Sequence, residues 1–140
     1  MTGNMPVKDS TGTTVYIATS GAGSDADPFV IKRTMLPQTP TTLSGTVTAS
    51  YVTALSWSCL LYPKKTIIIT NTHATLTMKY RIRGFAKSGS SYYNEIQAEY
   101  TLAALTSRPH IIDNSYDLIT VEVKDGSGHA TYVIDYTGGF

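Results

Sequence analysis

Apolar and polar residues alternate along two stretches of the chain between Leu76 and Leu102. The apolar positions are Leu76, Met78, Tyr80 and Ile82 in the first stretch, and Ile96, Ala98, Tyr100 and Leu102 in the second. This period of two predicts two strands, each with one buried and one solvated face. Ser88 and Gly89 lie midway between the stretches, so we expect the two strands to form a hairpin.

Both faces of this hairpin indicate the same register. On the polar face, Arg83 would lie opposite Glu95, and Lys79 opposite Glu99. On the apolar face, the same register pairs Ile82 with Ile96, Tyr80 with Ala98 and Met78 with Tyr100. A shift by one residue would turn every apolar side chain to solvent, so the agreement supports this pairing.

The alternation returns at the end of the chain. Its apolar positions are Ile119, Val121 and Val123, followed by Ala130, Tyr132, Ile134 and Tyr136. The Asp-Gly-Ser-Gly segment between them is typical of a turn. We therefore expect a second hairpin with Lys124 opposite His129, in which Val121 lies beside Tyr132 and Ile119 beside Ile134.

Other segments are typical of strands and surface connections. Residues Lys65–Thr70 include three consecutive isoleucines, which favours a central strand. The Thr- and Val-rich segment Leu43–Leu55 predicts one or two strands, and His110–Ile112 predicts a short one. Two prolines in the segment 34–42 indicate an extended linker.

The first third of the chain is rich in small and polar residues. Val15–Thr19 and Phe29–Arg33 predict two short strands joined by a Gly/Ser/Asp segment. In that segment Asp25 and Asp27 fit Asx-turns, and the alternative is that they supply two ligands to a calcium ion. We interpret residues 1–14 as a disordered tail or as an arm that orders only against a neighbour.

Together these segments predict an all-β protein, an antiparallel β-sandwich or jelly-roll-like barrel with an extended N-terminal arm. We expect an arm at 1–14, a hairpin and Thr/Pro-rich extended segment at 15–62, and an antiparallel β domain at 63–140. A chain of 140 residues is long enough for one core, and Trp57 and Cys59 fit such a core.

Composition narrows the function. A net charge of +1 and a charged fraction of 15% argue against a nucleic-acid binder. The single cysteine excludes an internal disulfide framework. The N-terminus lacks the pattern of a signal peptide, and no apolar run is long enough to span a bilayer. We therefore expect a soluble protein made in a cytoplasm, with no membrane partner.

The sequence contains no pattern of catalytic residues. His73, His110 and His129 are the only histidines, and their spacing is not that of metal ligands. No Gly-x-Ser-x-Gly segment is present. The carboxylates on the predicted strands fall on solvated faces, opposite cations. We expect no enzyme activity, no metal and no cofactor.

One segment carries a family resemblance. Residues 15–30, VYIATSGAGSDADPFV, resemble a stretch near the start of structural proteins of tailed bacteriophages: a strand, a Gly/Ser/Asp turn, and Asp-Pro-Phe leading into the next strand. The Thr-rich middle and the β-rich C-terminal half are similar to head decoration (auxiliary capsid) proteins. This resemblance implies a β-rich module, often trimeric, clamped on the outside of a capsid shell, with no catalytic residues.

We therefore predict a structural virion protein made in the host cytoplasm, a capsid decoration protein whose partner is the major capsid protein, and a homo-oligomer, with a trimer favoured. The candidate partner-binding residues are Met5, Val7, Tyr16, Phe29, Tyr92, Tyr93 and Phe140. The alternatives are a tail, collar or fibre-base protein, and a carbohydrate-binding module that stacks sugars on Trp57, Tyr92 and Tyr93.

Overall fold

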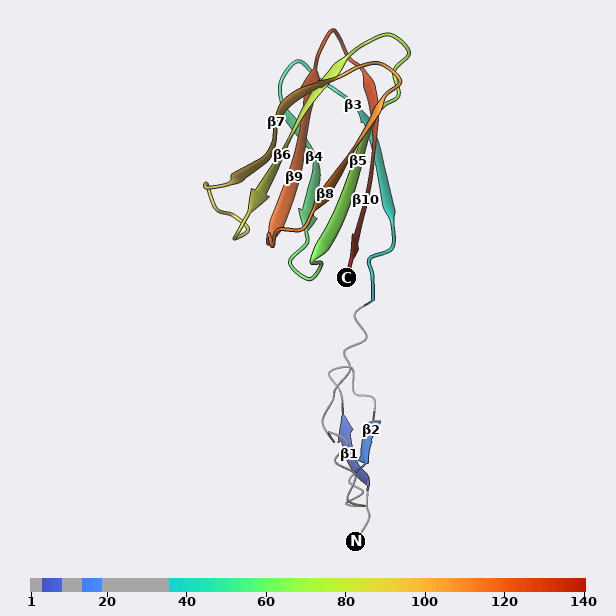
Figure 1. Ribbon diagram of the computed structural model, residues 1–140, viewed down its shortest axis with the longest axis vertical. Helices are drawn as coiled ribbons and strands as arrows, with labels where there is room; N and C mark the ends of the chain where they lie inside the picture. Colours follow the sequence, from blue (N-terminus) through green and yellow to red (C-terminus); the bar gives the residue numbers. More distant parts are fainter. Residues whose placement is uncertain (1–3, 9–13, 19–35) are drawn as a thin grey trace. The chain divides into compact units, whose positions relative to one another are not determined.

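The computed structural model describes residues 4–8, 14–18 and 36–140, and the chain divides into two units between Thr34 and Met35. In the first unit, β1 (Asn4–Lys8) pairs antiparallel with β2 (Thr14–Ala18). The second unit is built from eight further strands (Figure 1). These are β3 (Thr41–Thr46), β4 (Val52–Ser58), β5 (Lys64–Asn71), β6 (Met78–Phe85), β7 (Asn94–Leu102), β8 (Ser107–Ile112), β9 (Leu118–Asp125) and β10 (Thr131–Gly139).

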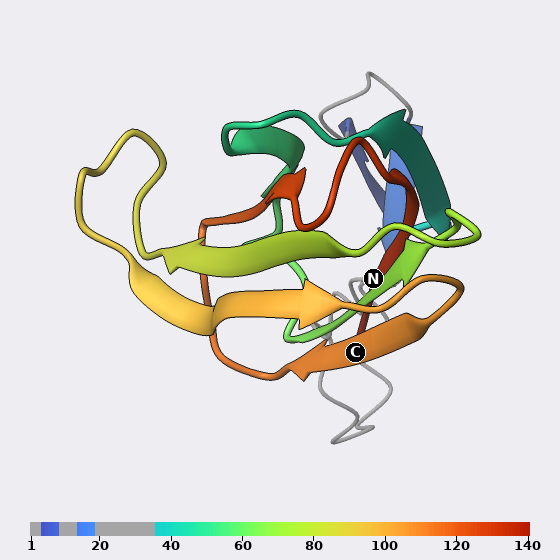
Figure 2. The ribbon, with the colours of Figure 1, turned by 90° about the horizontal axis from the view of Figure 1, so that it is seen from above.

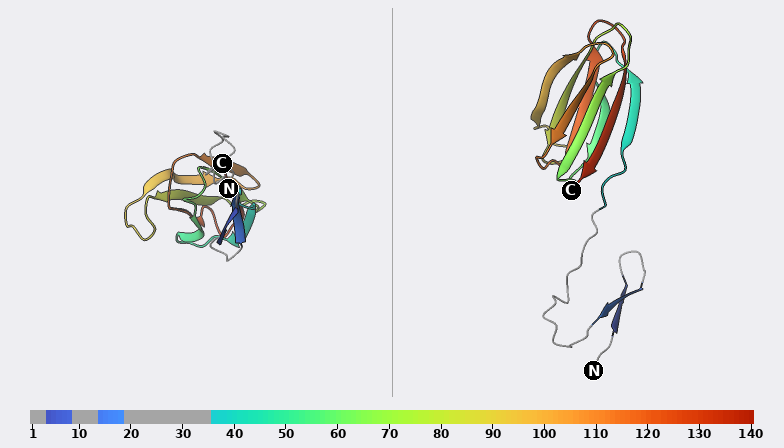
Figure 3. Two further views of the ribbon diagram at one scale, coloured as in Figure 1. Left: turned by 90° about the horizontal axis from the view of Figure 1, so that it is seen from below. Right: turned by 45° about the vertical axis from the view of Figure 1, so that its right-hand side comes forward.

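The eight strands form two antiparallel sheets of four, in the orders β3-β10-β5-β8 and β4-β9-β6-β7. Figure 3 shows three strands of the first sheet, β5, β10 and β3, side by side. Every connection except β6–β7 carries the chain from one sheet to the other. This is the topology of a jelly roll, and it confirms the predicted all-β antiparallel sandwich. In the described part of the chain, no helix is long and apolar enough to cross a membrane.

The two inner faces meet in one core, because inward positions of each central strand are apolar. Fully buried side chains include Ile67, Ile69, Met78, Tyr80, Ile82, Ile119, Val121, Val123 and Ile134. Trp57 is 5% exposed and Cys59 is fully buried, so both fill the core as predicted. The predicted central strand is also confirmed, since β5 lies between β10 and β8.

The hairpin between β6 and β7 is confirmed, with a corrected register. Arg83 lies opposite Glu95 as expected, but Tyr80 lies opposite Tyr100 rather than Ala98. Two irregularities between Tyr80 and Arg83 shift the pairing. Such bulges add a residue to one strand, and they are frequent at sheet edges, where β7 lies.

The predicted hairpin at the end of the chain is wrong, because β9 and β10 belong to different sheets. Their apolar residues do point toward one another, but across the core: β9 pairs with β4 and β6, while β10 pairs with β3 and β5. Alternation alone cannot distinguish two strands that share a sheet from two strands that face each other across a sandwich.

The beginning of the chain contains a strand that the sequence did not predict. Residues Asn4–Lys8, inside the segment expected to be a tail or an arm, form a strand that pairs with β2. A polar segment satisfies its backbone groups when it pairs with a neighbouring strand, and composition does not show this. Strand β2 confirms the strand predicted near Val15. The predicted strand Phe29–Arg33 and the turn with Asp25 and Asp27 lie outside the described residues.

The middle of the chain belongs to the sandwich. The segment Leu43–Leu55 contributes to β3 and β4, which confirms strands there, and the strand expected at His110–Ile112 is the end of β8. The extended linker ends at Pro40, because β3 begins with the next residue. The sandwich thus starts well before residue 63, where the sequence suggested a boundary.

Candidate partner-binding surface

The three histidines lie apart and have structural contacts. His110 Nε2 is 2.8 Å from the Tyr80 hydroxyl, and burial lowers the pKa of its ring. His73 accepts two backbone N–H groups, and His129 Nδ1 is 3.1 Å from the Asp125 carboxylate. Among the described residues, no three His, Cys, Asp or Glu side chains are grouped so that they could hold a metal ion.

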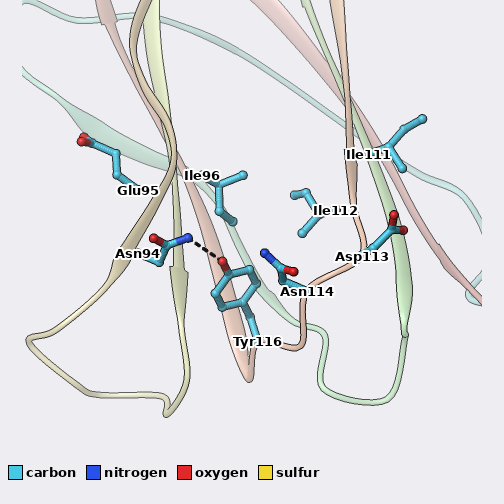
Figure 4. A pocket seen from close by; sticks show the side chains of 8 residues that line it. All are labelled: Asn94, Glu95, Ile96, Ile111, Ile112, Asp113, Asn114 and Tyr116. Carbon is cyan, nitrogen blue, oxygen red and sulfur yellow. Dashed lines mark hydrogen bonds between the residues drawn. The ribbon is translucent and has the colours of Figure 1, made fainter.

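An open pocket of about 320 Å³ lies between the edge strands β7 and β8 (Figure 4). Its lining residues are Asn94, Glu95, Ile96, Ile111, Ile112, Asp113, Asn114 and Tyr116. Asn94 Nδ2 donates a hydrogen bond to the Tyr116 hydroxyl at 2.6 Å, so these two polar groups of the pocket already bind each other. The residues that line the pocket include two carboxylates, Glu95 and Asp113, and no histidine, serine or cysteine.

The outward face of the sheet β4-β9-β6-β7 carries many charges, and we call it the charged face. Its charged residues are Lys79, Arg81 and Arg83 on β6, Glu122 and Lys124 on β9, and Glu95 and Glu99 on β7. Glu122 pairs with Arg81, and its Oε2 is 3.3 Å from Arg83. Glu99 binds Lys79 at 2.7 Å and Lys124 at 2.9 Å.

Two tyrosines complete this network. The Tyr51 hydroxyl donates to Glu99 at 2.7 Å, and the Arg81 guanidinium lies 3.9 Å from the Tyr51 ring centre. The Arg83 guanidinium lies 4.0 Å from the Tyr93 ring centre. Hydrogen bonds from Lys79, Lys124 and Tyr51 lower the pKa of Glu99 to about 2. Most charges of this face therefore have partners on the same face.

The outward face of the sheet β3-β10-β5-β8 is different, and we call it the threonine-rich face. Its hydroxyl residues are Thr42, Ser44, Thr46, Thr66, Thr70, Ser107, Thr131 and Thr137. Its other residues are Lys64, Ile68, Pro109, Ile111, Val133, Asp135 and Gly139. Lys64 lies at one end, so Asp135 is the only charge in the middle of this face.

Several hydroxyls of the threonine-rich face are already hydrogen-bonded. Thr70 and Ser107 bond each other at 2.8 Å, and Thr42 donates to the Asp135 carboxylate at 2.5 Å. Thr131 accepts from Thr72 at 2.9 Å. A hydroxyl with a partner costs less to bury than a free one, so this face is less hydrophilic than its composition indicates.

The structure places the predicted partner-binding residues at separate points. Tyr92 is 88% and Tyr93 45% exposed in the β6–β7 loop, which extends beyond the sheets in Figure 2. Phe140 is 44% exposed, and its ring centre lies 6.3 Å from that of Tyr62. These positions do not form one patch with the threonine-rich face.

The other four candidates lie in the first unit. The backbone register places Met5 opposite Ile17, Val7 opposite Val15, and Pro6 opposite Tyr16. Phe29 lies outside the described residues.

Sequence reasoning missed the threonine-rich face, although its signal is in the chain. Thr66, Ile68 and Thr70 alternate with buried residues on β5, and Thr131, Val133 and Asp135 do so on β10. These patterns show that the outward positions are nearly uncharged. Only the sheet order shows that β5 and β10 are neighbours and combine into one surface.

No protein-family model matches the sequence, and neither does any curated protein sequence. Solved structures share the fold at low sequence identity. PirA matches with a TM-score of 0.54 and 14% identity, over 71% of this chain and 95% of that chain. A protein of the Bacillus endospore appendages, described as disulfide-linked pili, matches with a TM-score of 0.51 and 8% identity, over 75% and 88%. The mitogen of Yersinia pseudotuberculosis matches with a TM-score of 0.50 and 14% identity, over 74% and 88%.

These likenesses place the C-terminal unit in one class, the jelly-roll β-sandwiches. Their identities are too low to carry a function from one protein to another. A chain of the infectious bursal disease virus VP2 particle also matches, with a TM-score of 0.35 and 10% identity, over 96% of this chain and 37% of that chain. This value is too low to support an argument.

Proposed function

We propose that the chain is a structural virion protein that binds the outside of a tailed-phage capsid shell and stabilises it. The observation that carries this proposal is the threonine-rich face, whose interior holds one charge and on which several hydroxyls already have a hydrogen-bond partner. Protein interfaces are depleted of charged residues at their core, and such a surface loses little when it leaves water. The resemblance of residues 15–30 to structural proteins of tailed bacteriophages suggests that the partner is the capsid shell.

The size of the face fits weak binding by many copies. Four strands spaced at about 4.8 Å, with about seven residues at about 3.4 Å each, give a face of roughly 450 Å² in projection. A stable interface usually buries about 800 Å² on each partner. One copy would therefore bind weakly through this face alone, and avidity would come from an oligomer or from further contacts.

Stabilisation would follow from linkage. Copies that bind only the assembled shell shift its equilibrium away from disassembly, because their binding free energy is lost when the shell comes apart. This role needs no catalytic residue, metal or cofactor. We further propose a trimer, to which the aromatic side chains Tyr92, Tyr93 and Phe140 contribute contacts beyond the threonine-rich face.

Purified shells of the phage that encodes the chain would test this proposal. The protein is mixed with empty shells and sedimented, and electron microscopy locates it on the bound particles. We expect saturable co-sedimentation, density on the outer surface of the head, and a higher melting temperature of the shells. Density only at the tail or collar would indicate the alternative virion role, and no binding to any virion part would refute the proposal.

One of the three residues expected to stack sugars in the carbohydrate-binding alternative is not accessible to a ligand. Trp57 is buried in the core at 5% exposure, and its ring lies 5.1 Å from that of Tyr136. A sugar would therefore have only Tyr92 and Tyr93 of the predicted set, and Tyr93 is already covered by Arg83 on one side.

A further inference from the structure

The centre of the threonine-rich face carries one acidic side chain. Asp135 lies on β10 between Thr42 of β3 and Ile68 of β5, and Pro109 of β8 follows in the same row. Its carboxylate is exposed, and its described partner is the Thr42 hydroxyl at 2.5 Å. Among the described residues of this face the cation is Lys64, which lies opposite Gly139 at the end of the sheet and therefore away from Asp135.

We propose that this face binds a different protein rather than a second copy of this chain, and that the partner supplies one lysine or arginine opposite Asp135. The partner surface around that cation is flat and nearly uncharged. This inference rests on the proposed function, and it adds the chemistry that the shell surface presents.

Charge complementarity excludes the second copy. Two identical faces related by a twofold axis would bring the two Asp135 carboxylates toward each other, because this residue lies near the middle of the face. Two like charges in a site that excludes water repel each other strongly, and a single cation from another protein removes that repulsion. A partner without a cation would bury the Asp135 carboxylate with the Thr42 hydroxyl but with no counter-ion.

The same reasoning excludes the charged face as the docking surface. Burial there would remove water from three carboxylates and four cations, most of which already have partners. The threonine-rich face has one pair of hydroxyls bonded to each other, Thr70 and Ser107, and apolar side chains at Ile68, Val133 and Ile111, the last 76% exposed. Removing water from the threonine-rich face therefore costs less free energy than removing it from the charged face. The Asp135 carboxylate would give the threonine-rich face its specificity for a partner.

The first test compares charge reversals on the two faces. D135K and E95K change the net charge equally, and both replace exposed residues. With purified shells, we expect D135K to bind at least about 30-fold more weakly than the unmodified chain and D135N about tenfold more weakly. E95K should bind within about twofold, because it lies on the charged face. Equal binding by D135K and the unmodified chain, or a loss specific to E95K, would overturn the inference.

A second test needs only the purified chain, so it distinguishes failure of this inference from failure of the proposed function. I68C places a thiol beside Asp135, where two faces would meet in a twofold dimer. Under mild oxidation we expect no cross-linked dimer from I68C, and a clear dimer from the double variant I68C/D135T, which has no central charge. A dimer that forms as readily when Asp135 is present would overturn the inference, even where the chain binds shells.

If the unmodified chain does not bind shells, the proposed function fails, and the cross-linking result still decides whether Asp135 prevents self-association. Melting temperatures of all variants within about 3 °C of the unmodified chain would show that the exposed substitutions leave the fold intact.

Discussion

The two outer faces of the sandwich enclose the same core and differ in almost every other property. The charged face carries seven charged residues, six of which are joined by ion pairs, whereas the threonine-rich face has a single charge in its interior. Each face is assembled from four strands whose inward residues are similarly apolar. The core therefore determines the fold, while the outward positions are free to specify what each face contacts.

The difference shows two ways of satisfying polar groups on a sheet. Charges need partners of opposite sign and remain near water, because complete burial of an ion pair costs more than it returns. Hydroxyls can bond across strands, as Thr70 and Ser107 do, and then need no further partner from water. The first arrangement keeps the charges of a face in water, and the second lowers the free-energy cost of removing water from a face.

The largest change in the free energy of unfolding is expected for a core residue, compared with an outward-facing neighbour on the same strand. Ile134 and Val133 are neighbours on β10, and Ile134 is fully buried while Val133 points outward. We expect Ile134→Ala to lower the free energy of unfolding by about 2–5 kcal/mol, since it leaves a cavity. Val133→Ala should cost below about 1 kcal/mol. Urea denaturation followed by circular dichroism measures both, and similar losses would contradict the burial.

A smaller effect is expected at the centre of the charged face. Glu122→Gln removes the carboxylate that pairs with both Arg81 and Arg83 and leaves two cations side by side. Since these pairs are partly buried, we expect a loss of about 1–2 kcal/mol. The matched control is Glu95→Gln, whose carboxylate forms no ion pair with the described residues and which should change stability by less than about 0.5 kcal/mol. An equal effect of the two variants would show that the network contributes nothing.

The pH dependence sharpens the same comparison. The pKa of Glu99 falls from its ordinary value of 4.5 to about 2 in the folded chain. The stabilisation from this carboxylate is therefore complete above pH 4.5 and is lost as the pH falls toward 2. We expect Glu99→Gln to have a lower melting temperature at pH 6 and a flatter decline between pH 4.5 and 2. A decline parallel to that of the unmodified chain would assign the acid sensitivity to other groups.

The smallest effect is expected on the threonine-rich face. Replacing Thr70 by Val and Ser107 by Ala removes both members of a hydroxyl pair and keeps the shape of the surface. Removing both partners of a hydrogen bond is nearly neutral, so the free energy of unfolding should change by less than about 0.5 kcal/mol. Chemical denaturation of the double variant tests this, and a loss above about 1 kcal/mol would mean that the hydroxyls hold the two strands together.

Residue alternation predicts which positions of a strand are buried, but it does not predict which residues of other strands they contact. On β6, the alternation of Met78, Tyr80 and Ile82 with Lys79, Arg81 and Arg83 correctly divided buried from solvated positions. It did not show that Glu122 forms ion pairs with both arginines, since that requires β9 to be the neighbour of β6. The ion pair between Lys79 and Glu99 was expected, and it forms although the two residues are not directly opposite.

The threonine-rich face illustrates the same limit. The outward hydroxyl positions on β5 and β10 can be identified from alternation, but β10 lies more than 60 residues after β5 in the chain. The central position of Asp135 depends on the pairing of β10 with both β3 and β5. No local pattern carries that information.

The alternation of residues was sufficient to show that the C-terminal part of this chain is all-β and which residues of its long strands face inward, because burial of alternate apolar side chains is a local requirement. The tertiary structure alone decided which strands are neighbours. Strands β9 and β10 could bury their apolar faces either by pairing or by facing each other across the core, and local alternation is equally well satisfied in both cases. Only the packing of all eight strands decides between these two arrangements. The same packing determines which residues share each outer face.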